Sequence, residues 1–211
     1  MRKLARIVVV AVLFVPALAS AQVSLGARLG YGLAMGEVFE DVDQGDFLSG
    51  QLPLQLDLGY RVNPALTVGG YFAFGLGRVG DTYEEDCDFD GVDCTGRVYR
   101  LGIQLDYRFA GPSATPWIGA GIGYEWASFE IEEGDAYLRS SFKGFEFLNL
   151  QGGVEWKTSA QFSIGPFAML SLARYASGEV ESNVLPEGSG DIEDKSFHQW
   201  LQLGVRGRFD L

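Results

Sequence analysis

Apolar and polar residues alternate with a period of two along several long segments of the chain. In segment 99–109, one face of an extended chain would carry Tyr99, Leu101, Ile103, Leu105, Tyr107 and Phe109. Such alternation is typical of a β-strand whose two faces meet different surroundings. After the N-terminal residues, no segment has a helical period or 18 consecutive apolar residues. The pattern therefore favours an all-β fold without transmembrane helices.

Eight segments have this character, and they are long for strands. Globular strands average about 5 or 6 residues. Strands of about 10 to 13 residues, tilted by roughly 40°, cross the hydrocarbon core of an outer membrane. The expected strands are approximately 23–35, 50–62, 66–78, 97–109, 116–129, 144–157, 161–175 and 197–210.

The connections between these segments alternate in length. The short ones are 63–65, 110–115 and 158–160, and the long polar ones are about 36–49, 79–96, 130–143 and 176–196. Short turns on one rim and long loops on the other predict an eight-stranded antiparallel up-and-down transmembrane β-barrel, with its long loops outside the cell.

Two kinds of barrel fit an alternating pattern, and they differ in which face is inside. A soluble barrel has an apolar interior, whereas a membrane barrel has an apolar exterior. The polar face is rich in glycine, which suits a narrow interior better than a solvated surface. It also carries both charge signs, so burial can be offset by pairing. We therefore expect a polar interior network of Arg28, Asp57, Arg61, Arg100, Asp106, Arg108, Glu125, Glu155, Arg206 and Arg208.

A proline interrupts the seventh segment. Pro166 lacks the N–H that a closed ladder of hydrogen bonds would use. We expect a β-bulge there as compensation.

The N-terminus has the three parts of a secretory signal peptide. Arg2, Lys3 and Arg6 precede the apolar run 7–18, and 19–21 reads Ala-Ser-Ala. The run is short for a membrane anchor, and a small-residue cleavage site follows it. We predict a cleaved signal peptide over 1–21 and a single barrel domain over 22–211.

The signal peptide, eight strands, alternating loops and amphipathic last strand resemble the small outer-membrane β-barrel proteins of bacteria, such as OmpX-like proteins and the transmembrane domain of OmpA. The resemblance is one of pattern, and the chain departs from it by ending in Leu211, with Phe209 two places earlier. It implies a bacterial outer-membrane location, contact with membrane lipid and lipopolysaccharide, insertion by the barrel-assembly machinery and a monomer. It favours a structural or surface-interaction role for a plugged barrel.

The acidic residues concentrate in the predicted long loops. The net charge is −12, which argues against a nucleic-acid partner, and 22 of the 28 acidic residues lie in the four loops. Segment 86–91 reads D-x-D-x-D-G, which is how calcium loops begin. The closing glutamate of an EF-hand would fall on Arg97, so the hypothesis is a weak Ca²⁺ site in the 79–96 loop, at Asp86, Asp88, Asp90 and Asp93. The alternative is a solvated acidic loop that binds no cation.

The two cysteines, Cys87 and Cys94, lie in the same predicted loop and are separated by six residues. Because disulfides persist in oxidising compartments, we expect a disulfide between them.

Two other functions remain as alternatives. Glycines inside the barrel leave room for a narrow pore or small-solute channel. Some barrels of this size modify lipid A, which needs a hydroxyl nucleophile and a histidine base. The single histidine, His198, follows Ser196, but the His-x-Ser motif of such deacylases is absent, and a histidine at a strand end is expected at the rim. We therefore expect no enzyme.

Overall fold

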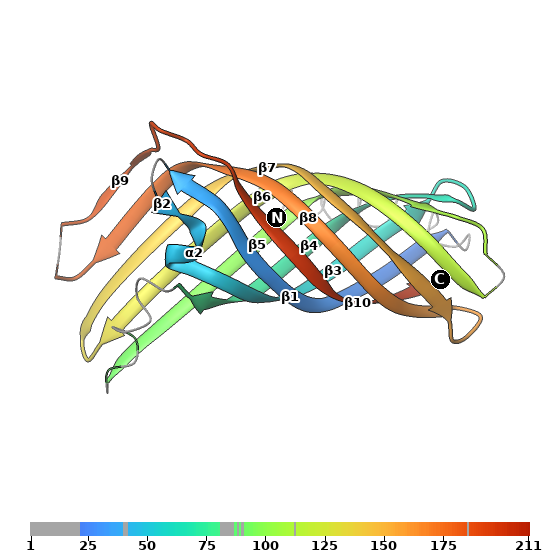
Figure 1. Ribbon diagram of the computed structural model, residues 1–211, viewed down its shortest axis with the longest axis horizontal. Helices are drawn as coiled ribbons and strands as arrows, with labels where there is room; N and C mark the ends of the chain where they lie inside the picture. Colours follow the sequence, from blue (N-terminus) through green and yellow to red (C-terminus); the bar gives the residue numbers. More distant parts are fainter. Residues whose placement is uncertain are drawn as a thin grey trace, which may run out of the picture.

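The computed structural model describes residues 22–39, 42–80, 87, 89, 91–111, 113–184 and 186–211, and its main feature is a closed β-barrel (Figure 1). The predicted signal peptide lies outside these residues. Among the described residues no helix is long and apolar enough to cross a membrane. Within these described ranges, three small elements do not belong to the ring: β2 (Val42–Asp43), α2 (Gln44–Phe47) and β9 (Gly188–Asp191). The ring itself is made of β1 (Val23–Phe39), β3 (Leu48–Arg61), β4 (Leu66–Val79), β5 (Val92–Arg108), β6 (Ala114–Glu133), β7 (Ala136–Lys157), β8 (Phe162–Ser182) and β10 (His198–Asp210).

Each ring strand is antiparallel to the next one in the chain, and the last strand closes the ring. Gly204 of β10 lies opposite Phe167 of β8 on one side and Gly30 of β1 on the other. The all-β, up-and-down barrel is therefore confirmed, and each of the eight predicted segments is a ring strand.

The two ends of the barrel differ in how the strands are joined. We call the end with the short β3–β4, β5–β6 and β7–β8 connections the turn end, and the opposite end the hairpin end; they lie to the right and left in Figure 1. At the turn end, the Asn63 side-chain oxygen accepts hydrogen bonds from the backbone N–H groups of Ala65 and Leu66, both at 2.9 Å. This local turn chemistry lets β4 start a few residues after β3 ends.

The apolar face of the strands is outside and the polar face is inside. On β5, the outward Ile103 is 62% exposed, whereas the inward Arg100 is 1% exposed. The same alternation holds on β3, where Leu54, Leu56 and Leu58 are exposed. This arrangement is that of a membrane barrel and excludes the soluble alternative.

Glycine makes room inside the barrel for large side chains. A Cβ atom on Gly102 would lie 2.5 Å from the Tyr71 hydroxyl, and one on Gly123 would lie 2.3 Å from it. The absence of side chains at these two positions lets Tyr71 cross the interior, where it is buried. Scarce interior volume therefore explains inward glycines of this kind.

The predicted loop 130–143 is in fact a β-hairpin. Strands β6 and β7 continue to Glu133 and Ala136, and the two residues between them form a turn with Gly134 at φ +60°. Arg139 bridges Glu130 at 2.6 Å and Glu181 at 3.2 Å. The polar composition predicts a loop, but opposite charges on neighbouring strands support a solvent-facing sheet.

The predicted loop 176–196 is also partly strand. β8 continues to Ser182, and its outer part pairs with β9 from Ser177↔Asp191 to Val180↔Gly188. β9 thus lies at the edge of an extension beyond the barrel (Figure 1). The other two predicted loops are shortened too, because β1 runs to Phe39 and β5 starts at Val92.

The expected bulge at Pro166 is absent, and a bulge lies elsewhere. Pro166 pairs in register with Val205 of β10, and on the β7 side the pairs Gly153↔Phe167 and Trp156↔Ile164 keep one register across it. The pairs between them are missing, so the ladder tolerates the absent N–H without inserting a residue. The register between β7 and β8 instead shifts at two other places, between Lys143 and Gly144 and between Glu146 and Leu148.

An apolar cluster closes the interior at the hairpin end. It consists of the buried residues Val38, Leu48, Val98, Ala127, Phe129, Tyr175 and Trp200. Phe47 of α2 packs against it and contacts Phe142 with ring centroids 5.7 Å apart. We call this cluster with Phe47 the apolar plug; burial of these groups away from water stabilises the closed end.

Candidate functional site

Two arginines and two aspartates form a buried network in the lumen, in the half of the barrel nearer the turn end; we call it the central network. Arg28 Nε lies 2.7 Å from Asp57 Oδ2, and Arg206 Nη2 lies 2.6 Å from Asp106 Oδ2. The guanidinium carbons lie 5.5 Å (Arg28) and 4.2 Å (Arg206) from the centre of the Trp117 ring. Charge pairing and cation–π contact together offset the cost of burying these charges.

Glutamine side chains extend this central network across the lumen. Gln55 and Gln104 donate to the same Asp57 oxygen at 2.8 and 3.0 Å, and Gln151 donates to Gln104 at 3.0 Å. These residues come from β3, β5 and β7, so the hydrogen bonds join strands on different sides of the ring.

A second polar layer, nearer the hairpin end, centres on Glu125. One of its oxygens accepts from the Tyr175 hydroxyl at 2.6 Å and from Trp200 Nε1 at 3.3 Å, and it lies 3.0 Å from His198 Nε2. His198 also stacks on Tyr175, with ring centroids 4.1 Å apart. The rim position expected for His198 is wrong: its side chain is 0% exposed, because the inward face of β10 carries it under the plug.

The same layer contains a buried Tyr–Glu–Arg group. The Tyr71 hydroxyl donates a hydrogen bond to Glu146, and Arg100 Nη1 lies 3.5 Å from the other Glu146 oxygen. Asn149 donates to the Tyr71 hydroxyl at 3.1 Å. Polar side chains therefore fill this level of the interior as well.

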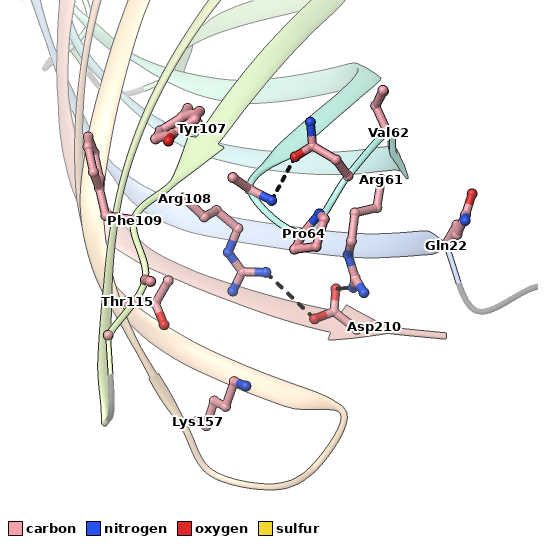
Figure 2. A pocket seen from close by; sticks show the side chains of 14 residues that line it. Gln22, Arg61, Val62, Pro64, Tyr107, Arg108, Phe109, Thr115, Lys157 and Asp210 are labelled. Carbon is pink, nitrogen blue, oxygen red and sulfur yellow. Dashed lines mark hydrogen bonds and ion pairs between the residues drawn. The ribbon is translucent and has the colours of Figure 1, made fainter.

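The turn end opens into a pocket of about 630 Å³ (Figure 2). Arg61 and Arg108 both point toward Asp210, at 2.7 and 3.6 Å, and Lys157 lines the same pocket from the end of β7. We call it the turn-end pocket; it is lined by Gln22, Arg61, Val62, Asn63, Pro64, Ala65, Tyr107, Arg108, Phe109, Ala110, Gly111, Thr115, Lys157 and Asp210.

The residues predicted for the interior network fall into two groups. Arg61 and Arg108 are partly exposed and lie at the turn end rather than deep in the lumen. The other eight are buried: Arg28, Asp57, Arg100, Asp106, Glu125, Glu155, Arg206 and Arg208.

Sequence reasoning missed Glu146, which is as buried as Glu125. Glu146 and Glu155 have opposite parity on β7, so a strict period of two cannot place both inside. The register shift between Glu146 and Leu148 resolves this, and leaves both Phe147 and Leu148 exposed outside. The adjacent apolar residues Phe147 and Leu148, in an otherwise alternating strand, are the sequence signal of this register shift.

The predicted calcium site lies mostly outside the described residues. Asp86, Asp88 and Asp90 are not described, and Asp93 is exposed at the start of β5. Within the described ranges, no group of three His, Cys, Asp or Glu side chains is arranged to hold a metal ion. Cys87 and Cys94 form a disulfide with their Cα atoms 5.7 Å apart, and both pack against the apolar plug.

A second concave surface of about 830 Å³ lies on the extension of β6 to β9. Tyr99 and Trp126 line it together with Lys143, Glu179 and Asp191. Serine hydroxyls from neighbouring strands also line it, so it offers aromatic faces beside hydrogen-bonding groups.

The sequence matches a family of known proteins over almost its whole length. The model of the outer membrane protein beta-barrel domain matches residues 7–209. A comparison with curated proteins finds no match.

Several solved structures share the fold at low sequence identity. Neisserial surface protein A (NspA) is 14% identical, with a TM-score of 0.55 over 90% of this chain and 97% of that one. A major outer membrane protein from Thermus thermophilus is 14% identical, with a TM-score of 0.57 over 90% and 100%. OprG from Pseudomonas aeruginosa is 12% identical, with a TM-score of 0.51 over 90% and 98%.

Proposed function

The chain belongs to the family of bacterial outer membrane β-barrel proteins, and on this premise we propose that it is a sealed barrel with a structural and surface-interaction role. It is located in the outer membrane. In such barrels the short turns face the periplasm, so we assign the turn end to the periplasm and the hairpin end to the exterior.

The observation that carries this proposal is the filled lumen. The central network of Arg28, Asp57, Asp106 and Arg206 is followed by the Glu125 layer and then by the apolar plug. A hydrated ion would have to break buried ion pairs and then cross an apolar region, and both steps are costly. The surfaces available for contact with other molecules are then the two ends of the barrel.

The exterior end supplies a surface suited to contact with other molecules. The extension of β6 to β9 projects beyond the barrel and carries acidic residues such as Glu132, Glu133 and Glu179, together with the concave surface beside Trp126. Concave surfaces that combine aromatic and hydrogen-bonding groups commonly bind other molecules. We propose this extension as the surface-interaction region.

The narrow-pore alternative has less support. One polar cavity lies between the turn end and the central network, lined by Asp57, Thr67, Arg206 and Arg208 among others. Its volume is about 10 Å³, which is room for roughly one water molecule. A single enclosed water does not make a path for ions or solutes.

We also propose that the protein is not a lipid A-modifying enzyme. His198 is enclosed by Tyr175, Trp200 and Glu125, and a base for hydroxyl activation must reach its substrate. Unchanged lipid A in cells that overproduce the protein is the expected result, and a new acylation pattern would contradict it.

We also propose that the barrel-assembly machinery inserts the protein and that the protein is a monomer. Every strand of the ring pairs on both sides, so the ring leaves no open edge for a second copy, and the edge strand β9 outside the ring is only four residues long. Light scattering in detergent is expected to give the mass of one chain, and a dimer would contradict this.

Conductance across a planar bilayer tests the seal. The folded protein, identified by its heat-shifted gel band, is expected to give no discrete steps in concentrated KCl. The variant Arg28→Ala/Asp57→Ala/Leu48→Ala/Phe129→Ala removes a complete ion pair without leaving an unpaired charge, together with two side chains of the apolar plug, so it is expected to admit ions. Leu54→Ala/Leu56→Ala, on the outer face of β3, is the matched control and is expected to stay closed. Discrete steps from the unaltered protein would overturn the proposal.

A further inference from the structure

The turn-end pocket has a charge opposite to that of the protein as a whole. The net charge of the chain is −12, yet Arg61, Arg108 and Lys157 line this pocket, and Asp210 is the one acidic residue among the described residues that line it. Arg61 is 27% exposed and Lys157 is exposed, so solutes can reach both. The proposed seal does not use this pocket.

The carboxylates at this end are too few for the cations. Asp210 lies 2.7 Å from Arg61, 2.9 Å from Arg208 and 3.6 Å from Arg108. The other carboxylate, Glu155, lies 2.9 Å from Arg108. Together with Lys157, the described side chains at the turn end comprise four cations and two carboxylates.

Some of the donors at this end also lack acceptors. Arg108 Nε and Arg208 Nη1 are buried and have no hydrogen-bond partner among the described groups. A buried donor without an acceptor is costly, and more so when it is charged. Of these two arginines, Arg108 lines the turn-end pocket and Arg208 lines the small polar cavity of about 10 Å³, so an anion in the pocket would relieve the charge imbalance around Arg108.

We propose that the turn-end pocket binds a doubly negative oxyanion group, either a phosphate or a pair of carboxylates. The planar fork of arginine matches the oxygen geometry of both groups, and Lys157 adds a flexible positive charge. The cavity of about 630 Å³ accommodates a small ligand. By the orientation proposed above, the ligand comes from the periplasm; this inference goes beyond the proposed seal and does not depend on it.

Titration calorimetry on the folded full chain tests the inference with two probes. Sodium phosphate and sodium succinate are each titrated into the protein in a zwitterionic detergent, with sodium chloride as the reference. Saturable binding of one equivalent in the millimolar range or tighter is expected for at least one probe. Binding is expected to weaken as salt screens the exposed charges.

Charge-neutralising variants locate the site. Arg61→Gln and Lys157→Gln are each expected to weaken binding about tenfold. Lys143→Gln makes the same charge change at the hairpin end and is expected to leave the Kd unchanged within about twofold. Lys157 is exposed, so its variant keeps the test valid if Arg61→Gln fails to show the heat-shifted band of the folded barrel.

Each result of the titrations either supports or overturns the proposed site. Binding of phosphate alone or succinate alone supports the site and identifies the ligand class, and binding of both supports the shared chemistry. No saturable binding of either probe would overturn the proposal. Equal weakening by Lys143→Gln and Lys157→Gln would overturn it too, because the effect would then come from net charge.

Discussion

The hairpin end and the turn end of this barrel differ in the sign of their charge and in whether the lumen is closed. The hairpin end carries an excess of negative charge on exposed strands, and beneath it the apolar plug of Phe129, Trp200 and their neighbours closes the lumen. The turn end carries an excess of positive charge around Asp210 and remains open as a pocket.

Buried and exposed ion pairs also differ in how much they contribute to stability. Arg206 is buried with Asp106 at 2.6 Å, and Asp57 and Glu155 each lie 3.6 Å from it. In the extension, Arg139 and Glu181 lie 3.2 Å apart, with side chains that are 39% and 42% exposed. The difference lies in the surroundings: water screens the exposed pairs, whereas buried charges have only each other.

The largest effect is expected from removing one partner of the buried network. Arg206→Leu leaves Asp57, Asp106 and Glu155 without their shared cation, and we expect a loss of about 3–5 kcal/mol in the free energy of unfolding. Urea titration followed by the heat-shifted band measures it. Arg97→Leu, on the exposed face of β5, is the control and should cost less than about 0.5 kcal/mol. Equal losses would mean that burial does not set the value of these charges.

Removing the disulfide is expected to have an intermediate effect, confined to the hairpin end. The Cys87–Cys94 bridge closes a short loop against the plug, and Cys87→Ser/Cys94→Ser should lose roughly 2 kcal/mol by the chain-entropy argument. Hydrogen exchange should speed up in the outer parts of β5 and β6 and stay unchanged near the turn end. Faster exchange throughout the ring would contradict a local role.

The exposed Arg139–Glu181 pair of the extension should contribute least of the structural contacts. The hydrogen bond to Glu130 raises the pKa of Arg139, so its charge persists at every pH of interest. Glu181→Gln should nevertheless cost at most about 1 kcal/mol, and less at high salt. Thermal melting at two salt concentrations checks this, and a loss as large as that of Arg206→Leu would remove the contrast between exposed and buried pairs.

Calcium is expected to have the smallest effect. The hypothesised site at Asp86, Asp88, Asp90 and Asp93 remains a proposal, and a ligand at a concentration equal to its Kd stabilises a protein by only about 0.4 kcal/mol. A rise in melting temperature with Ca²⁺, absent in Asp88→Asn/Asp90→Asn, is the expected result. No difference between the two proteins would leave the loop as a solvated acidic segment.

The sequence predicts the barrel well because its main signal is local. Each strand repeats inward and outward positions, as in 99–109, and mixed charges with inward glycines identify the inside. Prediction failed where the signal was not local. The bulge beside Phe147 reverses the parity of β7, so alternation alone does not place Glu146 inside. Charged residues such as Arg139 predict a loop, because their partners lie on other strands.

The plug and the turn-end pocket needed three-dimensional packing to be seen. The plug joins residues from β1, β3, β5, β6, β8 and β10, and no single segment shows that these side chains meet. A weak signal was present on β6, where the inward positions change from Glu125 to Ala127 and Phe129. The convergence of Arg61, Arg108 and Arg208 on Asp210 likewise depends on how three strand ends come together.

Cysteine labelling in intact cells tests most directly which end is presented to the outside. Ser189→Cys lies on exposed β9 at the hairpin end, and Ser159→Cys lies in the exposed β7–β8 turn. A membrane-impermeant maleimide is expected to label Ser189→Cys in intact cells, and Ser159→Cys only after the outer membrane is permeabilised. Labelling of Ser159→Cys in intact cells, with Ser189→Cys protected, would reverse the orientation and contradict the account of both ends.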